Sequence, residues 1–260
     1  MLDGMTRYEV RGPVAWLTLD RPEKLNAMTR AFFAELAEHM AVAGQDEAVR
    51  VVVIHGAGKC FSVGGDIEGF GELGGTGDRR AYVQEALRSF RAVEELSKPT
   101  IAAVHGHALG GGCEISMACH IRILKESARM GQTESNLGII PGYGGTQRFP
   151  RLIGRGLALE HLILGTQIPA PECYRIGLAN RLSKEGETLN DAKALAREIV
   201  KRPPIASRLI IEAVDDGIQA PIDQAIEIEV RAFDKVLKTE DAGEGIQAFF
   251  QKRPAQFKGK

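Results

Sequence analysis

Residues 100–117, TIAAVHGHALGGGCEISM, decide how this sequence is expected to fold. The run 100–104 is short and apolar, as is typical of a strand buried between two layers. The glycines at 110–112 then precede a pattern that predicts a helix through Met117. Because the first amides of a helix have no intrahelical acceptor, the N–H of Gly111 can point at an anion or a developing oxyanion. The alternative is that these glycines only allow tight packing of helix against strand.

A second glycine-rich turn also lies between a predicted strand and a predicted helix. Residues 60–67, CFSVGGDI, follow the apolar run 51–54 and lead toward a short predicted helix. Gly65 can offer a second amide beside that of Gly111, and two converging N–H groups form an oxyanion hole. Asp66 has a simpler interpretation as the N-cap of the short helix.

The segments around these two turns alternate between strand and helix patterns up to about residue 130, which predicts an α/β fold. The runs 8–11 and 14–19 flank Gly12-Pro13 and predict a hairpin. Thr29 can cap a helix whose apolar residues recur at helical spacing, and a further helix is expected over about 78–96. Later helical patterns cover 144–164, 170–176, 189–201, 205–216, 221–237 and 240–250.

No Ser/Gly linker or internal repeat interrupts the chain. We therefore expect an α/β core over 1–195 and a helical C-terminal region over 196–260. This region would pack on itself or on a neighbouring subunit.

The composition is that of an ordinary globular protein, apart from its glycine. More than half of the 30 glycines in 260 residues lie between Gly56 and Gly145. The formal net charge of −1 provides no overall field for binding nucleic acid or an anionic membrane. The N-terminus lacks an apolar targeting region and no apolar run is long enough to span a bilayer, so we expect a cytoplasmic protein. Four irregularly spaced cysteines fit reduced thiols better than disulfides.

Two glutamates are the candidates for acid–base chemistry. Glu114 lies in the first turn of its predicted helix, where the macrodipole favours the ionised carboxylate that a general base requires. Glu134 follows twenty residues later. If the fold brings them together, one carboxylate can take a proton while the other gives one. Taken singly, each is better explained as a solvated or capping acid.

The sequence lacks the motifs of several other kinds of functional site. The sequence has no Walker loop, no dinucleotide-binding glycine fingerprint and no G-x-S-x-G nucleophile elbow. His and Cys residues near 105–120 do not have the spacing of zinc ligands, so no metal site is expected.

Four ordered motifs resemble those of the enoyl-CoA hydratase/isomerase (crotonase) family, most closely its hydratases. They are RPEKLNA at 21–27, FSVGGD at 61–66, ALGGGCE at 108–114 and LGIIPGYGGTQR at 137–148, and the ending 239–257 is also similar. The resemblance spans about residues 8–257. It implies a crotonase-like core of repeated ββα units with a C-terminal helical trimerisation region, assembled as a homo-trimer or a dimer of trimers.

The same resemblance implies a chemistry. Gly65 and Gly111 would hold the thioester oxygen of an acyl-CoA and stabilise an enolate. In the hydratase branch both acids are present, so Glu114 would activate water for attack on Cβ and Glu134 would deliver a proton to Cα. Coenzyme A would enter as part of the substrate, with no separate cofactor.

CoA-binding positions also follow from the resemblance. They are Lys24, Leu25, Val63, Gly65, Asp66 and Ile67. Phe249 and Lys252 would also meet CoA, from the C-terminal end of the same chain or of a neighbouring subunit. Lys252, Arg253, Lys258 and Lys260 stand in an end segment without acids, which can attract CoA phosphates or simply be solvated. Glu68 departs from the family, where lysine is common.

Acyl specificity stays open, because the glycine-rich segment 68–82 would border the acyl pocket. Straight-chain, branched and cyclic or dienoyl thioesters all remain candidates. The nearest alternative activity is enoyl-CoA isomerisation through Glu134. A non-catalytic CoA- or RNA-binding relative is disfavoured by the charge balance and by the presence of both acids.

Overall fold

The structure, a computed structural model, describes residues 4–67 and 79–260. Within them the main sheet has the strand order β1-β2-β3-β4-β6-β9 and a smaller sheet the order β5-β7-β8. The predicted hairpin is confirmed as the antiparallel pair β1/β2, and the remaining pairs of the main sheet are parallel. The strands are β1 (Thr6–Arg11), β2 (Val14–Leu19), β3 (Val51–Gly56), β4 (Thr100–Val104), β5 (His107–Leu109), β6 (Ile121–Lys125), β7 (Arg129–Gly131), β8 (Ile168–Pro169) and β9 (Arg181–Ser183).

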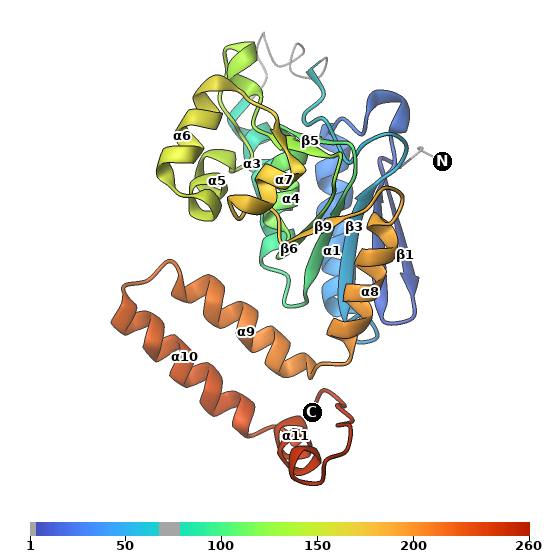
Figure 1. Cartoon of the computed structure of the whole chain (residues 1–260), viewed down its shortest axis with the longest axis vertical. Helices are drawn as coiled ribbons and strands as arrows, with labels where there is room; N and C mark the ends of the chain where they lie inside the picture. The colour runs from blue at the N-terminus through green and yellow to red at the C-terminus, as the bar shows by residue number, and fades with distance from the viewer. Residues whose placement is uncertain (1–3, 68–78) are drawn as a thin grey trace.

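Helices cover both faces of the main sheet, as the apolar run 51–54 predicts. Val52 and Ile54 of β3 face a core shared with α1 (Arg30–Gln45), α3 (Arg79–Glu94) and α4 (Gly111–Ala118). Val51 and Val53 face the opposite side and pack with α8 (Thr188–Val200). Because side chains alternate along a strand, one apolar run serves two layers (Figure 1). The expected α/β class is confirmed.

The helix predicted after Thr29 is α1. The Thr29 hydroxyl accepts a hydrogen bond from the amide of Phe32, which satisfies one of the free amides at the helix start. The apolar face of α1 is buried at Phe32, Phe33, Leu36 and Met40. Local capping and periodicity therefore determine this element.

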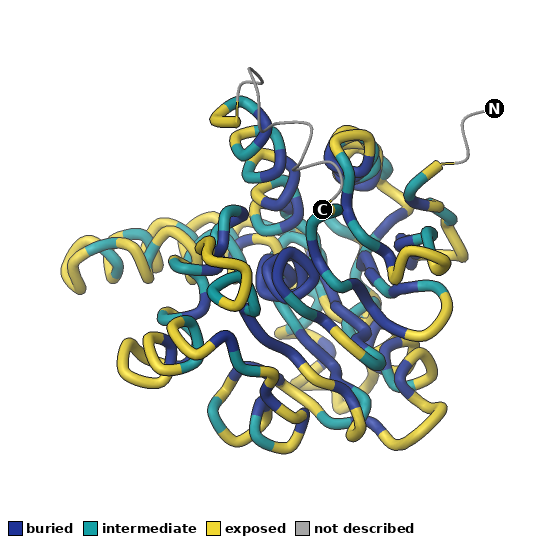
Figure 2. The backbone as a smooth tube through the Cα atoms, turned by 90° about the horizontal axis from the view of Figure 1, so that it is seen from above, coloured by how far each residue is buried: buried dark blue, intermediate teal, exposed yellow. Residues whose placement is uncertain are grey.

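The helix α4 is buried along its whole length. Figure 2 shows buried backbone gathered at the centre of the molecule, with exposed turns around it. A Cβ at Gly112 would collide with the backbone of Ser62, so at this glycine the tight-packing interpretation is correct. Gly111 is the residue that begins the helix, and its amide remains available.

The C-terminal half is mainly helical, as predicted, with one difference. The pattern over 144–164 is two helices, because Gly154 adopts φ 81°, a left-handed value that suits glycine and ends the first helix. The remaining helices are α5 (Gly145–Ile153), α6 (Arg155–Leu164), α7 (Ala170–Arg175), α9 (Pro204–Gly217), α10 (Ile222–Leu237) and α11 (Glu240–Phe250), with 3₁₀ turns η1 (Pro22–Lys24) and η2 (Glu134–Leu137).

Helices α9 and α10 pack on each other and extend away from the sheet (Figure 1). Their outer faces are strongly apolar, with Ile210, Ile222 and Phe233 each more than 60% exposed. The division at 195/196 stays a prediction. It falls inside α8, which packs on the sheet, whereas the extending helices begin at Pro204.

All four cysteines are buried free thiols, in agreement with their irregular spacing. In the described part of the chain, none of the helices combines the length and apolar character needed to cross a bilayer.

Candidate active site

The two glycine turns lie side by side. Ser62 forms an isolated parallel bridge with Ala108, and the amide of Leu109 donates to the Ser62 carbonyl at 3.0 Å. A Cβ at Gly64 would lie 2.9 Å from the amide nitrogen of Gly111. The turn after β3 and the start of α4, separate in the sequence, therefore form one surface.

Two backbone amides at this surface are available for a ligand. The Met28 amide donates to Gly64, and the Asp66 amide donates to Met28, so strand alternation directs the Gly65 N–H to the opposite edge. Gly111 begins α4, where amides have no intrahelical acceptor. No acceptor within residues 4–67 and 79–260 takes a hydrogen bond from either N–H. These two amides have the properties that an oxyanion hole requires.

Glu114 occupies the first turn of α4 and is only 1% exposed. Its Oε1 accepts hydrogen bonds from the amides of Tyr143 at 2.8 Å and Gly145 at 2.7 Å. Burial, together with the nearby charge of Glu134, raises the pKa of Glu114 to about 8. The helix dipole is expected to favour the ionised carboxylate, but desolvation outweighs it, so the net shift of the pKa is upward.

Glu134 begins η2 and lies against the start of α4. A Cβ at Gly110 would lie 3.1 Å from its Oε1, and the Gly110 carbonyl accepts the amide of Glu114. Its Oε2 is buried and has no hydrogen-bond partner among the described residues. Burial raises the pKa of Glu134 as well. The structure thus brings the two predicted acids to the same place.

Two nearby carboxyl groups that both resist ionisation tend to hold one proton between them. Such a pair contains a base and an acid at the same pH. Because Gly65 and Gly111 lie beside them, the site can move protons next to a stabilised oxyanion.

Six of the predicted CoA-binding residues lie in adjoining segments. The amide of Val63 donates to the Leu25 carbonyl at 3.2 Å, which places residues 24–25 beside 63–67. Leu25 and Ile67 are exposed. The carboxylate of Asp66 pairs with Arg21 at 2.5 Å, and the short helix expected after it falls largely on 68–78, outside the described residues.

Phe249 and Lys252 are not brought to that surface within one chain. Phe249 lies in the last turn of α11 and Lys252 just after that helix, which Figure 1 shows at the opposite end of the molecule from β5. Phe249 is 80% exposed. The basic end segment is partly neutralised, because Arg253 forms two hydrogen bonds with the carboxylate of Glu244.

Sequence reasoning missed the groups that hold the site in shape. The Asn26 side chain donates to the carbonyls of Ala57, Cys60 and Phe61, at 2.9, 2.9 and 3.1 Å, and so anchors the turn that carries Gly65. It also missed the amides that hold Glu114, because only the tertiary fold brings Tyr143 and Gly145 to that side chain. Asn26 lies within one of the four motifs, which was the available signal.

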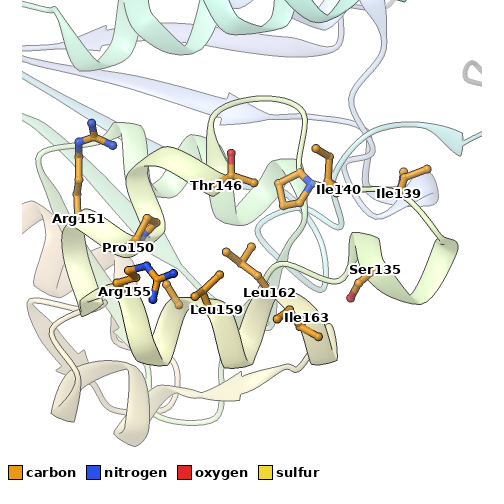
Figure 3. A pocket seen from close by; sticks show the side chains of 12 residues that line it. Ser135, Ile139, Ile140, Thr146, Pro150, Arg151, Arg155, Leu159, Leu162 and Ile163 are labelled. Carbon is orange, nitrogen blue, oxygen red and sulfur yellow. The ribbon is translucent and has the colours of Figure 1, made fainter.

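A cavity lies elsewhere on the described part of the chain. It measures about 720 Å³ and is lined mainly by apolar side chains of α5, α6 and residues 139–141, as Figure 3 shows for Ile140, Leu159 and Leu162. Ser135 borders it, but neither Glu114 nor Gly111 does. The segment 68–82, expected beside an acyl pocket, is described only from residue 79 onward.

No group of three or more His, Cys, Asp or Glu side chains in the described ranges is arranged to hold a metal ion.

Comparison with known proteins gives consistent matches. The family model described as enoyl-CoA hydratase/isomerase matches residues 9–260. The short-chain-enoyl-CoA hydratase of Clostridium acetobutylicum is 42% identical over 246 residues, and the crotonyl-CoA hydratase of Syntrophomonas wolfei is 40% identical over 245, each covering 94% of both chains. The crystal structure of enoyl-CoA hydratase from Bacillus anthracis has a TM-score of 0.93 at 36% identity, covering 98% of this chain and 100% of that one.

Proposed function

This chain belongs to the enoyl-CoA hydratase/isomerase family, and we propose that it is an enoyl-CoA hydratase. It would add water across the 2,3 double bond of a 2-enoyl-CoA to give a 3-hydroxyacyl-CoA. The observation that carries this proposal is the pairing of Glu114 and Glu134 around Gly110, beside the free amides of Gly65 and Gly111.

The amides of Gly65 and Gly111 would receive the thioester carbonyl oxygen. Adding a nucleophile at Cβ moves electrons onto that oxygen, so donors placed there stabilise the resulting enolate more than the substrate.

We assign the base role to Glu114 and the acid role to Glu134. Burial raises the pKa of both acids, but the two amides on Oε1 of Glu114 oppose this and favour its ionised form. Oε2 of Glu134 is buried with no donor among the described residues, which favours the neutral acid. Glu114 takes a proton from water as the oxygen bonds to Cβ, and Glu134 gives its proton to Cα.

The CoA portion would lie along Lys24, Leu25, Val63, Asp66 and Ile67. Since Phe249 and Lys252 lie at the other end of the chain, they would reach CoA from a neighbouring subunit of a trimer or a dimer of trimers. No cofactor is needed, because coenzyme A arrives with the substrate. The buried free thiols support a cytoplasmic setting.

The test is to assay the protein with a panel of enoyl-CoA thioesters. Hydration is measured as the loss of the conjugated enoyl absorbance. The two relatives named for short-chain and crotonyl substrates make crotonyl-CoA the first member, followed by longer, branched and cyclic thioesters. We expect hydration of at least one member, and its absence across the whole panel contradicts the proposal.

A further inference from the structure

The turn that holds Glu114 is itself held from behind by an arginine. Nη1 of Arg148 donates to the carbonyl of Tyr143 at 2.9 Å, and the guanidinium packs so closely on Gly144 that a Cβ there would collide with it. The amides on either side, those of Tyr143 and Gly145, both donate to Oε1 of Glu114. The arginine thus acts on the peptide groups that connect these two donors.

Arg148 is itself fixed by an acid on another helix. Its Nε and Nη2 donate to the two carboxylate oxygens of Glu94 in α3, at 3.0 and 2.6 Å. The Arg148 side chain is 11% exposed and that of Glu94 is 40% exposed, so the guanidinium side of this two-pronged pair is shielded while the carboxylate meets water. A planar guanidinium held on one edge by Glu94 presents its remaining edge to Tyr143 in one orientation.

We propose that Arg148 is a positioning residue for hydration: by fixing the 143–145 turn, it sets the direction of the Glu114 carboxylate. This inference rests on the proposed function. Gly144 has φ 105°, and its backbone is little restrained because glycine has no Cβ. A hydrogen bond that holds the Tyr143 carbonyl therefore determines where the neighbouring amides point. A misplaced carboxylate lowers the rate even when substrate still binds.

The charge of Arg148 acts in the same direction as its geometry. It lowers the pKa of Glu114, against burial and the negative charge of Glu134, which raise it. Burial and then the charge of Glu94 raise the pKa of Asp215 in α9. Burial lowers the pKa of His120, and Glu94 opposes that shift. Among the described residues, the charge of Glu134 raises the pKa of Glu114 and the charge of Arg148 lowers it.

The kinetic test compares Arg148→Met, Arg148→Lys and the matched control Arg151→Met. Arg151 lies one turn later on α5, is exposed, and donates to Gln147 rather than to the turn. We expect Arg148→Met to lower kcat by about tenfold or more with KM for crotonyl-CoA nearly unchanged. Arg148→Lys should restore part of kcat, and Arg151→Met should match the wild type.

A second readout works without turnover. Carboxyl carbons of glutamate are labelled with ¹³C, the Glu114 signal is assigned by Glu114→Gln, and its titration is followed by NMR. In Arg148→Met the midpoint should rise by roughly half a unit or more, because a cation that favours the carboxylate is lost. In Glu94→Gln, which removes an anion from the exposed edge of the cluster, the midpoint should not rise.

The two readouts separate the two hypotheses. If no thioester is hydrated but the Glu114 midpoint rises in Arg148→Met, the proposed function fails and the link between Arg148 and Glu114 stands. If hydration occurs and Arg148→Met, or Arg148→Lys where the former does not fold, leaves both kcat and the midpoint at wild-type values, the positioning role is overturned.

Discussion

The backbone amide of Tyr143 donates a hydrogen bond to Oε1 of Glu114 at 2.8 Å, across a separation of 29 residues. A main-chain group, with that of Gly145, thus holds the buried carboxylate proposed as the base. The side chain at 143 does not make this bond. The site therefore depends on the path of the backbone between η2 and α5, and on whatever fixes that path.

Replacing either glutamate by its amide should remove hydration while the protein still folds. Glutamine keeps the shape of the side chain but cannot carry the proton, and loss of a positioned acid or base typically lowers the rate about 10²–10⁴-fold. We expect such losses in kcat for both Glu114→Gln and Glu134→Gln, measured with the best thioester of the panel.

The pattern across the two variants also tests the alternative activity. If both retain wild-type turnover, the two-carboxylate mechanism is wrong. If isomerisation of an enoyl-CoA survives Glu114→Gln but not Glu134→Gln, the protein is an isomerase that uses Glu134.

Glu114→Gln should stabilise the folded protein at high pH. The pKa of Glu114 is about 8 in the folded state against an ordinary value of 4.5, so between these values the folded state binds a proton that the unfolded state has lost. The free energy of unfolding therefore falls as the pH rises through this window, with the full loss present above about pH 8. Glutamine has no such dependence.

We expect the variant to gain about 1–3 kcal/mol over the wild type near pH 8.5, at roughly 1.4 kcal/mol per pKa unit with allowance for relaxation. The advantage should nearly vanish near pH 4.5. Urea unfolding at several pH values measures it, and an advantage independent of pH contradicts the raised pKa.

Gly64→Ala should block the Gly111 amide. The new Cβ would lie 2.9 Å from that nitrogen and 3.0 Å from the Leu109 carbonyl, at a backbone φ of 102° that disfavours alanine. Loss of one oxyanion donor lowers kcat about 10²–10³-fold. Gly186→Ala is the matched control, because Gly186 also has positive φ (78°) but nothing within 4 Å of its Cβ. Equal loss of activity in both variants rules out the blocking explanation.

Asn26→Ala should destabilise the turn that carries Gly65. The substitution leaves three carbonyls without their donor in a site where Asn26 is 3% exposed. Buried polar groups left unpaired cost about 1–3 kcal/mol each, so we expect a loss of about 2–4 kcal/mol in unfolding free energy after local relaxation. Asn190→Ala, at an exposed site on α8, should change it by less than about 0.5 kcal/mol. Similar values for the two variants contradict the anchoring role.

The apolar outer face of α10 should mediate self-association. Ile222, Ile226, Val230, Phe233 and Leu237 recur at helical spacing and are each more than half exposed, which is unusual for a face that meets water. We expect the wild type to have a mass of about three or six times 28.2 kDa by light scattering, and Val230→Glu to reduce it. Glu229→Gln, on the same helix, should retain the wild-type mass, and a monomeric wild type refutes the assembly proposal.

Much of the fold could be predicted from neighbours along the chain. Thr29 caps α1, alternating residues of 51–54 serve two cores, and the glycines at 110–112 mark the start of α4, because capping and periodicity act over a few residues. The interruption at Gly154 was missed, since a glycine within an apolar periodic pattern is compatible with a continuous helix.

The sequence by itself also identified the candidate oxyanion donors, Gly65 and Gly111, and the candidate acid–base residues, Glu114 and Glu134. Only the tertiary structure decided how they act. It placed Glu134 against Gly110, gave Glu114 its two amide donors, and reversed the expected direction of its pKa. The reason is physical: ionisation depends on burial and on charges and dipoles within a few ångströms, and these arrive from segments that are distant in the chain.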